Sequence, residues 1–323
     1  MSTPLLQLDD VRVHFTLADG LFGSKVLKAV DGISFTLEAG QTLGVVGESG
    51  CGKSTLARAI LGIHPPTSGR IWLEGEELTG KSRRELRPYR QAMQVVFQDP
   101  LASLNPRMTV GEAIAEPLRV FKPEMSAADR RGAVRRLMDL VGLLPNQINR
   151  YPHEFSGGQC QRIGIARALA VEPKLLLCDE PVSALDVSIQ AQIVNLLMDL
   201  QQEMGLAMVF IAHDLAVVRH ISDEVLVMYL GRAMEQASRD ELYARPQHPY
   251  TQALIDAVPI PDPVRERAKT VTLLRGDLPS PLAPPSGCVF RTRCPRAEAI
   301  CADSVPGLIG SQQGNSRVAC KFA

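Results

Sequence analysis

The stretch GESGCGKS, from Gly47 to Ser54, decides the fold of this chain. An apolar segment at Thr42 to Val46 precedes it, and a segment with helical character runs from Lys53 to about Leu61. Glycines at this spacing let the backbone close around phosphate oxygens at the positive end of the following helix. Lys53 is expected to reach the β- and γ-phosphates, and the Ser54 hydroxyl to ligate Mg²⁺. The order of strand, loop and helix therefore predicts a nucleotide-binding P-loop.

A second stretch, LLLCDEP from Leu175 to Pro181, supplies an acidic partner for this loop. Its apolar residues predict a buried strand, and Asp179 would arrive at the carboxyl edge of the sheet, beside the metal. Glu180 comes next, where a carboxylate would orient and polarise the attacking water. An acidic pair after a strand is often only a solvated strand end. The P-loop upstream makes this pair a candidate catalytic site.

A third stretch, FSGGQ from Phe155 to Gln159, has no obvious role inside the same nucleotide site. Ser156 and Gln159 fit a capping box, so that Gly157 and Gly158 begin a helix whose free N–H groups face outward. Such a helix end binds anions well, although alone it is simply a capped helix. We expect a second copy, or a close relative, to close around ATP.

Strands and helices are expected to alternate along most of the chain, which predicts an α/β fold with a mostly parallel sheet. The expected strands are Leu5–Phe15, Ile33–Leu37, Thr42–Val46, Met93–Phe97, Leu175–Cys178, Ala207–Ala212 and Glu224–Met228, and the expected helices are Lys53–Leu61, Ala127–Leu144 and Val187–Met204. Gly20 to Lys25 has the composition of a loop. Pro100, Pro106, Pro117 and Pro123 are expected to punctuate loops.

The domain plan has three parts. Residues 1–258 are expected to form an ATPase core, with a helical subdomain inserted at about 99–170. Residues 259–323 would form a separate C-terminal extension, because they are rich in proline and hold four of the seven cysteines.

Composition gives no reason to expect a nucleic-acid partner or a membrane-spanning segment. The 35 basic and 35 acidic residues balance, so the net charge gives no reason to expect a nucleic-acid partner. No run approaches the roughly 18 apolar residues of a membrane helix, and the first residues, MSTPLLQLDD, do not resemble a leader. The chain is expected in the cytosol, and any association with a membrane should come through another polypeptide.

Together the three stretches resemble the ATP-binding subunits of ABC transporters, and FSGGQ resembles that family's signature motif with Phe155 in place of Leu. The resemblance implies further roles. Phe15 would stack on adenine, Gln98 would contact Mg²⁺ and the attacking water, and His213 would contact the γ-phosphate. SALD, from Ser183 to Asp186, would pass between two subunits. No essential position looks degraded, so hydrolysis of ATP is expected.

The resemblance assigns three groups of site residues. The catalytic group is Glu180, His213 and Gln98, and Mg²⁺ is assigned to Ser54, Gln98 and Asp179. Residues that bind the nucleotide are Phe15, Gly47, Glu48, Ser49, Gly50, Cys51, Gly52, Lys53, Ser54, Thr55, Ser156, Gly157, Gly158, Gln159 and Asp186.

Three further stretches resemble the peptide-type importers, a group that takes up dipeptides, oligopeptides or nickel. They are FQDPLASLNPRMTVGEAIAEPL at Phe97 to Leu118, HPYTQAL at His248 to Leu254, and DLPSPLAPPSGC at Asp277 to Cys288. The chain is most similar to the F-type ATPase of dipeptide systems. The resemblance implies a heterodimer with a sister ATPase, two membrane permeases, an extracytoplasmic solute-binding protein and a peripheral location on the cytoplasmic face of the inner membrane.

Four cysteines gather in the extension, at Cys288, Cys294, Cys301 and Cys320. Four thiols in a reducing compartment are not expected to form disulfides, and four sulfur ligands suit zinc or an iron–sulfur cluster. Relatives of this type can hold a [4Fe–4S] cluster in their tails, so a cluster is the first hypothesis. Zinc and unligated thiols are the alternatives. Cys51, Cys160 and Cys178 are interpreted as small packing residues.

Two other classes of function compete with transport. One is an ABC ATPase of DNA repair or translation, although such proteins carry long coiled-coil insertions or two ATPase halves, and this chain has neither. The other is a redox-sensing regulator that uses the cysteine tail. Co-purification with membrane proteins would separate transport from both.

Overall fold

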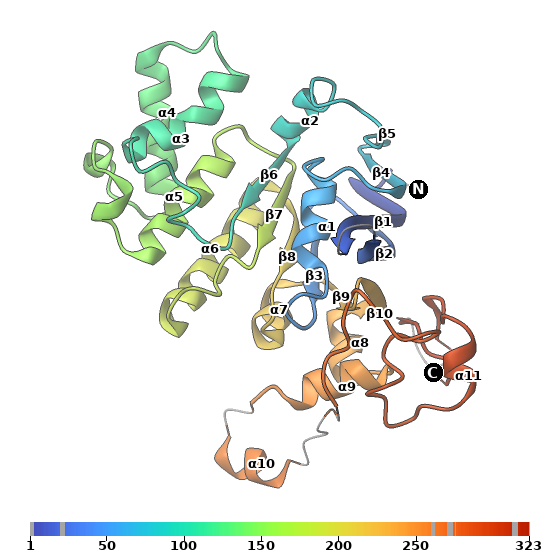
Figure 1. Cartoon of the computed structure of the whole chain (residues 1–323). Coiled ribbons are helices and arrows are strands. Elements are labelled where there is room, and N and C mark those ends of the chain that lie inside the picture. Colours follow the sequence, from blue (N-terminus) through green and yellow to red (C-terminus); the bar gives the residue numbers. More distant parts are fainter. Residues whose placement is uncertain are drawn as a thin grey trace. The chain divides into compact units, whose positions relative to one another are not determined.

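The computed structural model describes residues 3–19, 23–259, 262–269, 274, 276–311 and 316–322. The chain forms two compact units (Figure 1). The first unit comprises Met1–Leu5, Leu37–Gln41 and Gly80–Ile211, and the second comprises Leu6–Thr36, Thr42–Thr79 and Ala212–Ala323.

The first unit contains three parallel strands, with β7 in the middle. They are β6 (Met93–Val96), β7 (Leu175–Asp179) and β8 (Ala207–Ile211). Every residue of β7 and β8 is buried, as expected for parallel strands covered on both faces. Parallel neighbours need a crossover connection, which α6 (Val187–Met204) supplies between β7 and β8. The short helix α2 (Arg87–Ala92) leads into β6.

A helical part fills the sequence between β6 and β7. It consists of α3 (Val110–Phe121), α4 (Ala127–Leu140), the 3₁₀ turns η1 (Pro145–Gln147) and η2 (Pro152–Glu154), and α5 (Gly157–Leu169). Figure 1 shows α3, α4 and α5 grouped together, and each of them contacts the other two. Thr109 and Ser126 cap the first two of these helices through their side chains. These side chains satisfy backbone N–H groups at the N-termini of α3 and α4 and so stabilise both helices.

Pro117 lies inside α3, so the prediction that it punctuates a loop is wrong. A proline in a helix interior costs about 3 kcal/mol. Val110, Ile114 and Leu118 of the same helix are almost fully buried. Burial of three such side chains contributes about 1.5–3 kcal/mol each, which outweighs the local cost.

The second unit contains two groups of strands. An antiparallel sheet has the order β2, β1, β4, β5, formed by β1 (Leu6–Asp19), β2 (Gly23–Leu37), β4 (Ser68–Leu73) and β5 (Glu76–Glu77). The other group has the order β11, β12, β10, β9, β3, formed by β3 (Thr42–Val46), β9 (Glu224–Tyr229), β10 (Arg232–Ser238), β11 (Ile309–Gly310) and β12 (Arg317–Val318). Strands β3 and β9 are parallel, and the other pairs are antiparallel.

Among the described residues, the second unit has six helices. They are α1 (Lys53–Ile60), α7 (Leu215–Ile221), α8 (Arg239–Ala244), α9 (Pro249–Asp256), α10 (Pro263–Ala268) and α11 (Ile300–Asp303). Helix α1 is the next element after β3, so the loop between them has regular structure at both ends. Among the helices described, none combines the length and the apolar character required to cross a membrane.

The expected elements agree with the structure most closely in the buried core. Thr42–Val46 and Val187–Met204 match β3 and α6 residue for residue. Helix α4 ends at Leu140, before the predicted end at Leu144, and Gly142 follows with a left-handed φ of 72°. Glycine in this conformation is common just past a helix end.

The first two strands are longer than predicted. Strand β1 continues to Asp19, so Phe15 does not end it. Gly23 to Lys25 are strand rather than loop, whereas residues 20–22 of that predicted loop lie outside the described residues. The first residues of β2 are exposed, so their sequence lacks the apolar alternation that marks a half-buried strand.

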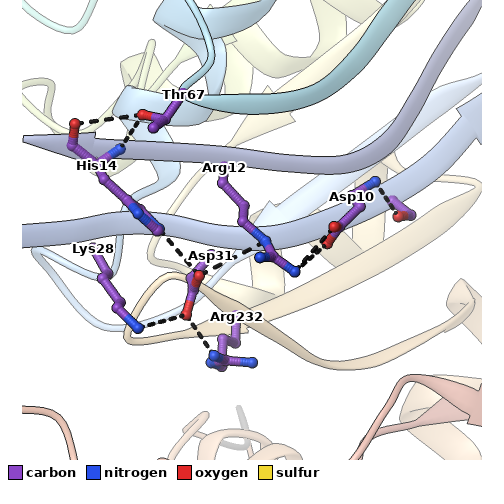
Figure 2. A network of polar contacts seen from close by, with 8 residues as sticks. Asp10, Arg12, His14, Lys28, Asp31, Thr67 and Arg232 are labelled. Atoms are coloured by element: carbon purple, nitrogen blue, oxygen red, sulfur yellow. Dashed lines mark hydrogen bonds and ion pairs between the residues drawn. The ribbon is translucent and has the colours of Figure 1, made fainter.

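A buried carboxylate on β2 joins two strands of the second unit. Figure 2 shows Asp31, 6% exposed, surrounded by basic side chains. Arg232 of β10 donates to its Oδ2 at 2.5 Å, and the distance from His14 Nε2 to Oδ1 is 3.1 Å. Lys28 and Arg12 lie farther away, at 3.9 and 4.0 Å. Burial raises the pKa of Asp31, but Arg232, His14 and Lys28 more than offset this and hold it below its ordinary value.

Asp31→Asn is expected to lower the free energy of unfolding by about 2 kcal/mol, because it leaves the largely buried Arg232 without its counter-charge. Urea denaturation measures the change. The pKa of Asp31 is lower in the folded protein, so its contribution is present above the unfolded value of about 4. The difference between variant and wild type should shrink as pH falls below that value.

Asp10→Asn is the matched control, because Asp10 forms its ion pair with Arg12 at an exposed position. Exposed pairs contribute less than about 1 kcal/mol. Equal losses in the two variants would contradict the special role of Asp31.

Candidate functional site

The P-loop lies between β3 and α1 in the second unit, and its backbone requires glycine at two positions. Gly47 and Gly52 have φ values of 154° and 105°. A Cβ on Gly47 would lie 2.1 Å from the Met228 carbonyl oxygen, and one on Gly52 would lie 2.0 Å from that of Ala29. No side chain fits at either place. Backbone carbonyl groups of β9 and β2 therefore lie against these two glycines with no room for a side chain between them.

Lys53 is 4% exposed and lies within the loop. Its Nζ donates to the carbonyl oxygens of Gly47, at 2.8 Å, and Glu48, at 3.1 Å. These bonds hold the ammonium group against the loop backbone at the N-terminus of α1. A glycine-rich loop with a buried lysine at a helix N-terminus fits the triphosphate of a nucleotide. Ser54 and Thr55 follow in the first turn of α1.

Three predicted site residues, two of them catalytic and one assigned to Mg²⁺, lie in the first unit at the carboxyl edge of the β6–β7 pair. Val96 pairs with Cys178, so Gln98 and Glu180 both lie two residues beyond the same register position. Gln98 Nε2 donates to Glu180 Oε2 at 3.1 Å. Asp179 is the last residue of β7 and is buried. The geometry confirms that these side chains share one sheet edge, as carboxyl ends of parallel strands do.

Glu180 has an unusual backbone conformation. Its φ of 49° lies in the left-handed region, which costs a non-glycine residue about 1 kcal/mol or more. Its N–H donates to the Ile211 carbonyl oxygen at 3.0 Å, and its own carbonyl oxygen accepts from Ser183 Oγ at 3.0 Å. These bonds hold the strained residue at the end of β7. Strain of this kind is common at catalytic positions.

The FSGGQ segment forms the capped helix end that the sequence predicts. Gln159 N donates to Ser156 Oγ at 3.4 Å, and Ser156 N donates to Gln159 Oε1 at 2.9 Å. Ser156 and Gly157 are exposed. A Cβ on Gly158 would lie 2.5 Å from Cγ2 of Ile189 in α6. The start of α5 is thus preformed and faces solvent within its own unit.

The remaining predicted site residues occupy separate places. Asp186 is an exposed N-cap residue of α6. Phe15 is half-buried on β1, where its ring contacts His64 edge-on at 5.5 Å between centroids. His213 follows β8 and is exposed. Phe15, His213 and the P-loop belong to the second unit, whereas Gln98, Asp179, Glu180, Ser156 and Asp186 belong to the first.

Three of the seven cysteines are buried away from the extension, as their interpretation as packing residues requires. They are Cys51, Cys160 and Cys178. Cys160, next to the signature motif, donates its thiol to the Pro152 carbonyl oxygen at 3.4 Å.

The four cysteines of the extension interact electrostatically in the folded chain. Burial raises the pKa of the Cys288 thiol, and the charges of Cys301, Cys294 and Cys320 raise it further. The thiols therefore lie near enough to interact. Across the described part of the chain, however, no group of three or more His, Cys, Asp or Glu side chains is arranged to hold a metal ion. The [4Fe–4S] hypothesis gains no support from this geometry.

Two residues that the sequence assigned to no role contact the P-loop. Arg293 Nη1 donates to both carboxylate oxygens of Glu48, each at 2.9 Å. Tyr250 Oη accepts from the backbone N–H of Glu48 at 3.0 Å. Tyr250 belongs to the HPYTQAL stretch, which is a sequence signal for peptide-type importers but does not indicate this contact.

Comparison with known proteins identifies two family regions. Residues 30–183 match a family described as "ABC transporter", and residues 234–301 match one described as "Oligopeptide/dipeptide transporter, C-terminal region". Two solved structures share the fold over much of the chain. One is an ATP-binding cassette called MJ0796, dimeric in a post-hydrolysis state with ADP and phosphate, with a TM-score of 0.66 at 28% identity over 72% of this chain and 98% of that one. The other is cbiO1 from Clostridium perfringens, with a TM-score of 0.65 at 28% identity over 75% of this chain and 91% of that one.

Relatives align over nearly the whole chain. "Oligopeptide transport ATP-binding protein OppF" of Escherichia coli is 64% identical over 311 residues, which are 95% of this chain and 93% of the relative. The protein of the same name from Haemophilus influenzae is 61% identical over 320 residues, which are 98% and 96% of the two chains. The chain therefore belongs to the family of ATP-binding subunits of ABC transporters, in its oligopeptide and dipeptide branch.

Proposed function

We propose that this chain is an ATP-hydrolysing subunit that energises the import of oligopeptides or dipeptides across the cytoplasmic membrane. One observation carries the proposal: 95% of the chain aligns, at 64% identity, with a relative named as an oligopeptide transport ATP-binding protein. The P-loop cradle and the Gln98–Glu180 pair support the chemistry that this name requires.

The P-loop residues would hold the phosphates of ATP. Backbone N–H groups of the P-loop, other than that of Glu48, which donates to Tyr250 Oη, and the ammonium of Lys53 would stabilise the negative charge, because a helix N-terminus and a buried cation both favour anions. Phe15 stacks on adenine in this proposal, and base stacking on an aromatic side chain contributes about 1–3 kcal/mol. Ser54, Gln98 and Asp179 are the proposed Mg²⁺ ligands. The metal neutralises charge on the phosphate oxygens when it is bound.

Glu180 would orient the attacking water and accept its proton. Gln98 restrains the carboxylate through their hydrogen bond, and His213 is proposed to contact the γ-phosphate. Phosphoryl transfer depends mainly on positioning and electrostatic stabilisation. A strained residue held by fixed backbone bonds suits that task, since its carboxylate needs little reorganisation.

A second ATPase chain would complete each nucleotide site. Ser156, Gly157, Gly158 and Gln159 of one chain, with Asp186 nearby, would close over the nucleotide that the P-loop of the other chain holds. The exposed, capped start of α5 supports this arrangement. We propose a sister ATPase as that chain, with two membrane permeases and an extracytoplasmic solute-binding protein as further partners. The subunit would then lie on the cytoplasmic face of the membrane.

Domain boundaries form part of the proposal. Residues 1–258 are the ATPase core, residues at about 99–170 the inserted subdomain, and residues 259–323 the extension. The grouping of α3, α4 and α5 supports the inserted subdomain.

Peptide uptake by cells tests the function directly. Cells that lack this chain should lose uptake of radiolabelled oligopeptides, and a wild-type copy should restore it. A Glu180→Gln copy should not. Dipeptide and nickel uptake in the same cells identify the substrate class. Unchanged uptake of every peptide would overturn the proposal.

The cysteine set is a separate hypothesis. We keep a [4Fe–4S] cluster as a hypothesis because four cysteines gather in the extension, although no group of side chains in the described part of the chain is arranged to hold a metal ion. Absorption near 400 nm, on protein purified without oxygen, decides the question. A colourless, iron-free sample would end the cluster hypothesis.

A further inference from the structure

The peptide group between Gly47 and Glu48 is held at both ends. Its carbonyl oxygen, on Gly47, accepts from Lys53 Nζ at 2.8 Å, and its N–H, on Glu48, donates to Tyr250 Oη at 3.0 Å. A peptide group that is bonded at both ends cannot rotate without breaking one bond. The orientation of the first turn of the P-loop therefore depends on a residue about 200 positions away in sequence.

The side chain of Glu48 is held as well. Arg293 Nη1 bridges both carboxylate oxygens and also lies 3.4 Å from Tyr229 Oη. The Arg293 side chain is 10% exposed and that of Glu48 is 25% exposed, so water screens this ion pair less than a surface pair. Burial lowers the pKa of Arg293, but its bonds to Tyr229 and Glu48 raise it by more. The pKa therefore lies above its ordinary value and the guanidinium stays charged.

An aromatic cluster fixes the positions of Tyr250 and Arg293, the two residues that contact Glu48. Tyr229, Tyr250 and Phe290 are fully buried, with ring centroids 4.8 to 5.3 Å apart. Phe290 lies three residues before Arg293, and Arg293 N donates to the Phe290 carbonyl oxygen at 2.9 Å. This turn points one side chain into the cluster and the other toward the P-loop. Because aromatic pairs in a packed core have little freedom, the cluster sets the position of Arg293.

From this geometry we infer that Arg293 and Tyr250 are positioning residues of the nucleotide site, and that the C-terminal region shapes the P-loop through Glu48. The inference rests on the proposed function, and it adds residues that lie outside the ATP-binding motifs. Arg293 acts through Glu48 rather than on the nucleotide. Its removal should therefore weaken nucleotide binding while the step of hydrolysis, which Glu180 serves, keeps its rate.

The test is nucleotide affinity and steady-state ATP hydrolysis of the full chain with and without these contacts. Arg293→Ala is expected to raise the Kd for a fluorescent ATP analogue and the KM for ATP about tenfold, because a charge-assisted bond is lost. The kcat should change less than about twofold. Arg293→Lys should restore part of the affinity, since one nitrogen makes all three hydrogen bonds. Tyr250→Phe should weaken binding about threefold, because the Glu48 N–H loses its acceptor.

Arg291→Ala is the matched control. Arg291 lies in the same segment but bonds to Ser286, at 2.9 and 3.2 Å, and not to the P-loop. A double-mutant cycle with Glu48→Gln isolates the ion pair: the double variant should bind ATP no more weakly than Arg293→Ala alone.

Three results would overturn the inference: an affinity for Arg293→Ala equal to that of Arg291→Ala, additive effects of Glu48→Gln and Arg293→Ala, or a lower melting temperature with no rescue by lysine. The last outcome would mean a merely structural role. Failure of the wild-type chain to bind ATP would instead overturn the proposed function.

Discussion

Glu180→Gln is expected to retain ATP binding and to lower the rate of ATP hydrolysis by about 100-fold to 10,000-fold. The amide has nearly the size of the carboxylate and can still bond to Gln98, 3.1 Å away in the wild type. It loses the negative charge and the capacity to accept a proton. Phosphate release under saturating ATP measures the rate, and binding of a fluorescent nucleotide measures affinity.

The same variant should accumulate as a closed, ATP-bound assembly with its partner ATPase, which light scattering can detect. Glu203→Gln is the control, because Glu203 is an exposed residue near the end of α6. Unchanged phosphate release by Glu180→Gln would remove Glu180 from its proposed role.

Lys53→Ala should act on binding rather than on turnover alone. Lys53 is buried and its ammonium lies against the P-loop carbonyl oxygens, so it is positioned to bond to phosphate. A hydrogen bond between charged groups contributes about 1.5–3 kcal/mol, so the affinity for ATP should fall about 10-fold to 100-fold. Isothermal titration calorimetry measures the loss.

Lys25→Ala removes an exposed positive charge from the same unit and should bind ATP like the wild type. If the two lysine variants bound ATP equally well, the P-loop assignment would be wrong.

The buried core is what the sequence predicts best. Strands β3 and β7 are short apolar runs between polar segments, and their burial leaves little choice of conformation. Helix α6 has an apolar face and a glycine with a φ of 63° at its end. The exposed start of β2 has no such apolar pattern, so the sequence does not predict it. Pro117 predicts a loop from its local preference, but the packing of α3 keeps it in the helix.

Motifs predict the local parts of the site, because each motif is a short stretch whose backbone geometry follows from its own residues. The capping box at Ser156 and the P-loop glycines are of this kind. Contacts between distant segments have no such signal. Arg293 and Glu48 are 245 positions apart, and Asp31 and Arg232 are 201 apart. Only the folded topology brings these residues together.

Strands β11 and β12 have a consequence for solubility. Each is only two residues long, and β12 pairs with Glu235 and Gln236 of the seven-residue β10. A long uncovered border strand offers rows of N–H and C=O groups to other molecules and promotes aggregation. Strand β12 covers the backbone groups of two residues of β10, and both short strands leave few backbone groups of their own exposed. A chain truncated before Ile309 would leave β10 uncovered, with a greater tendency to self-associate.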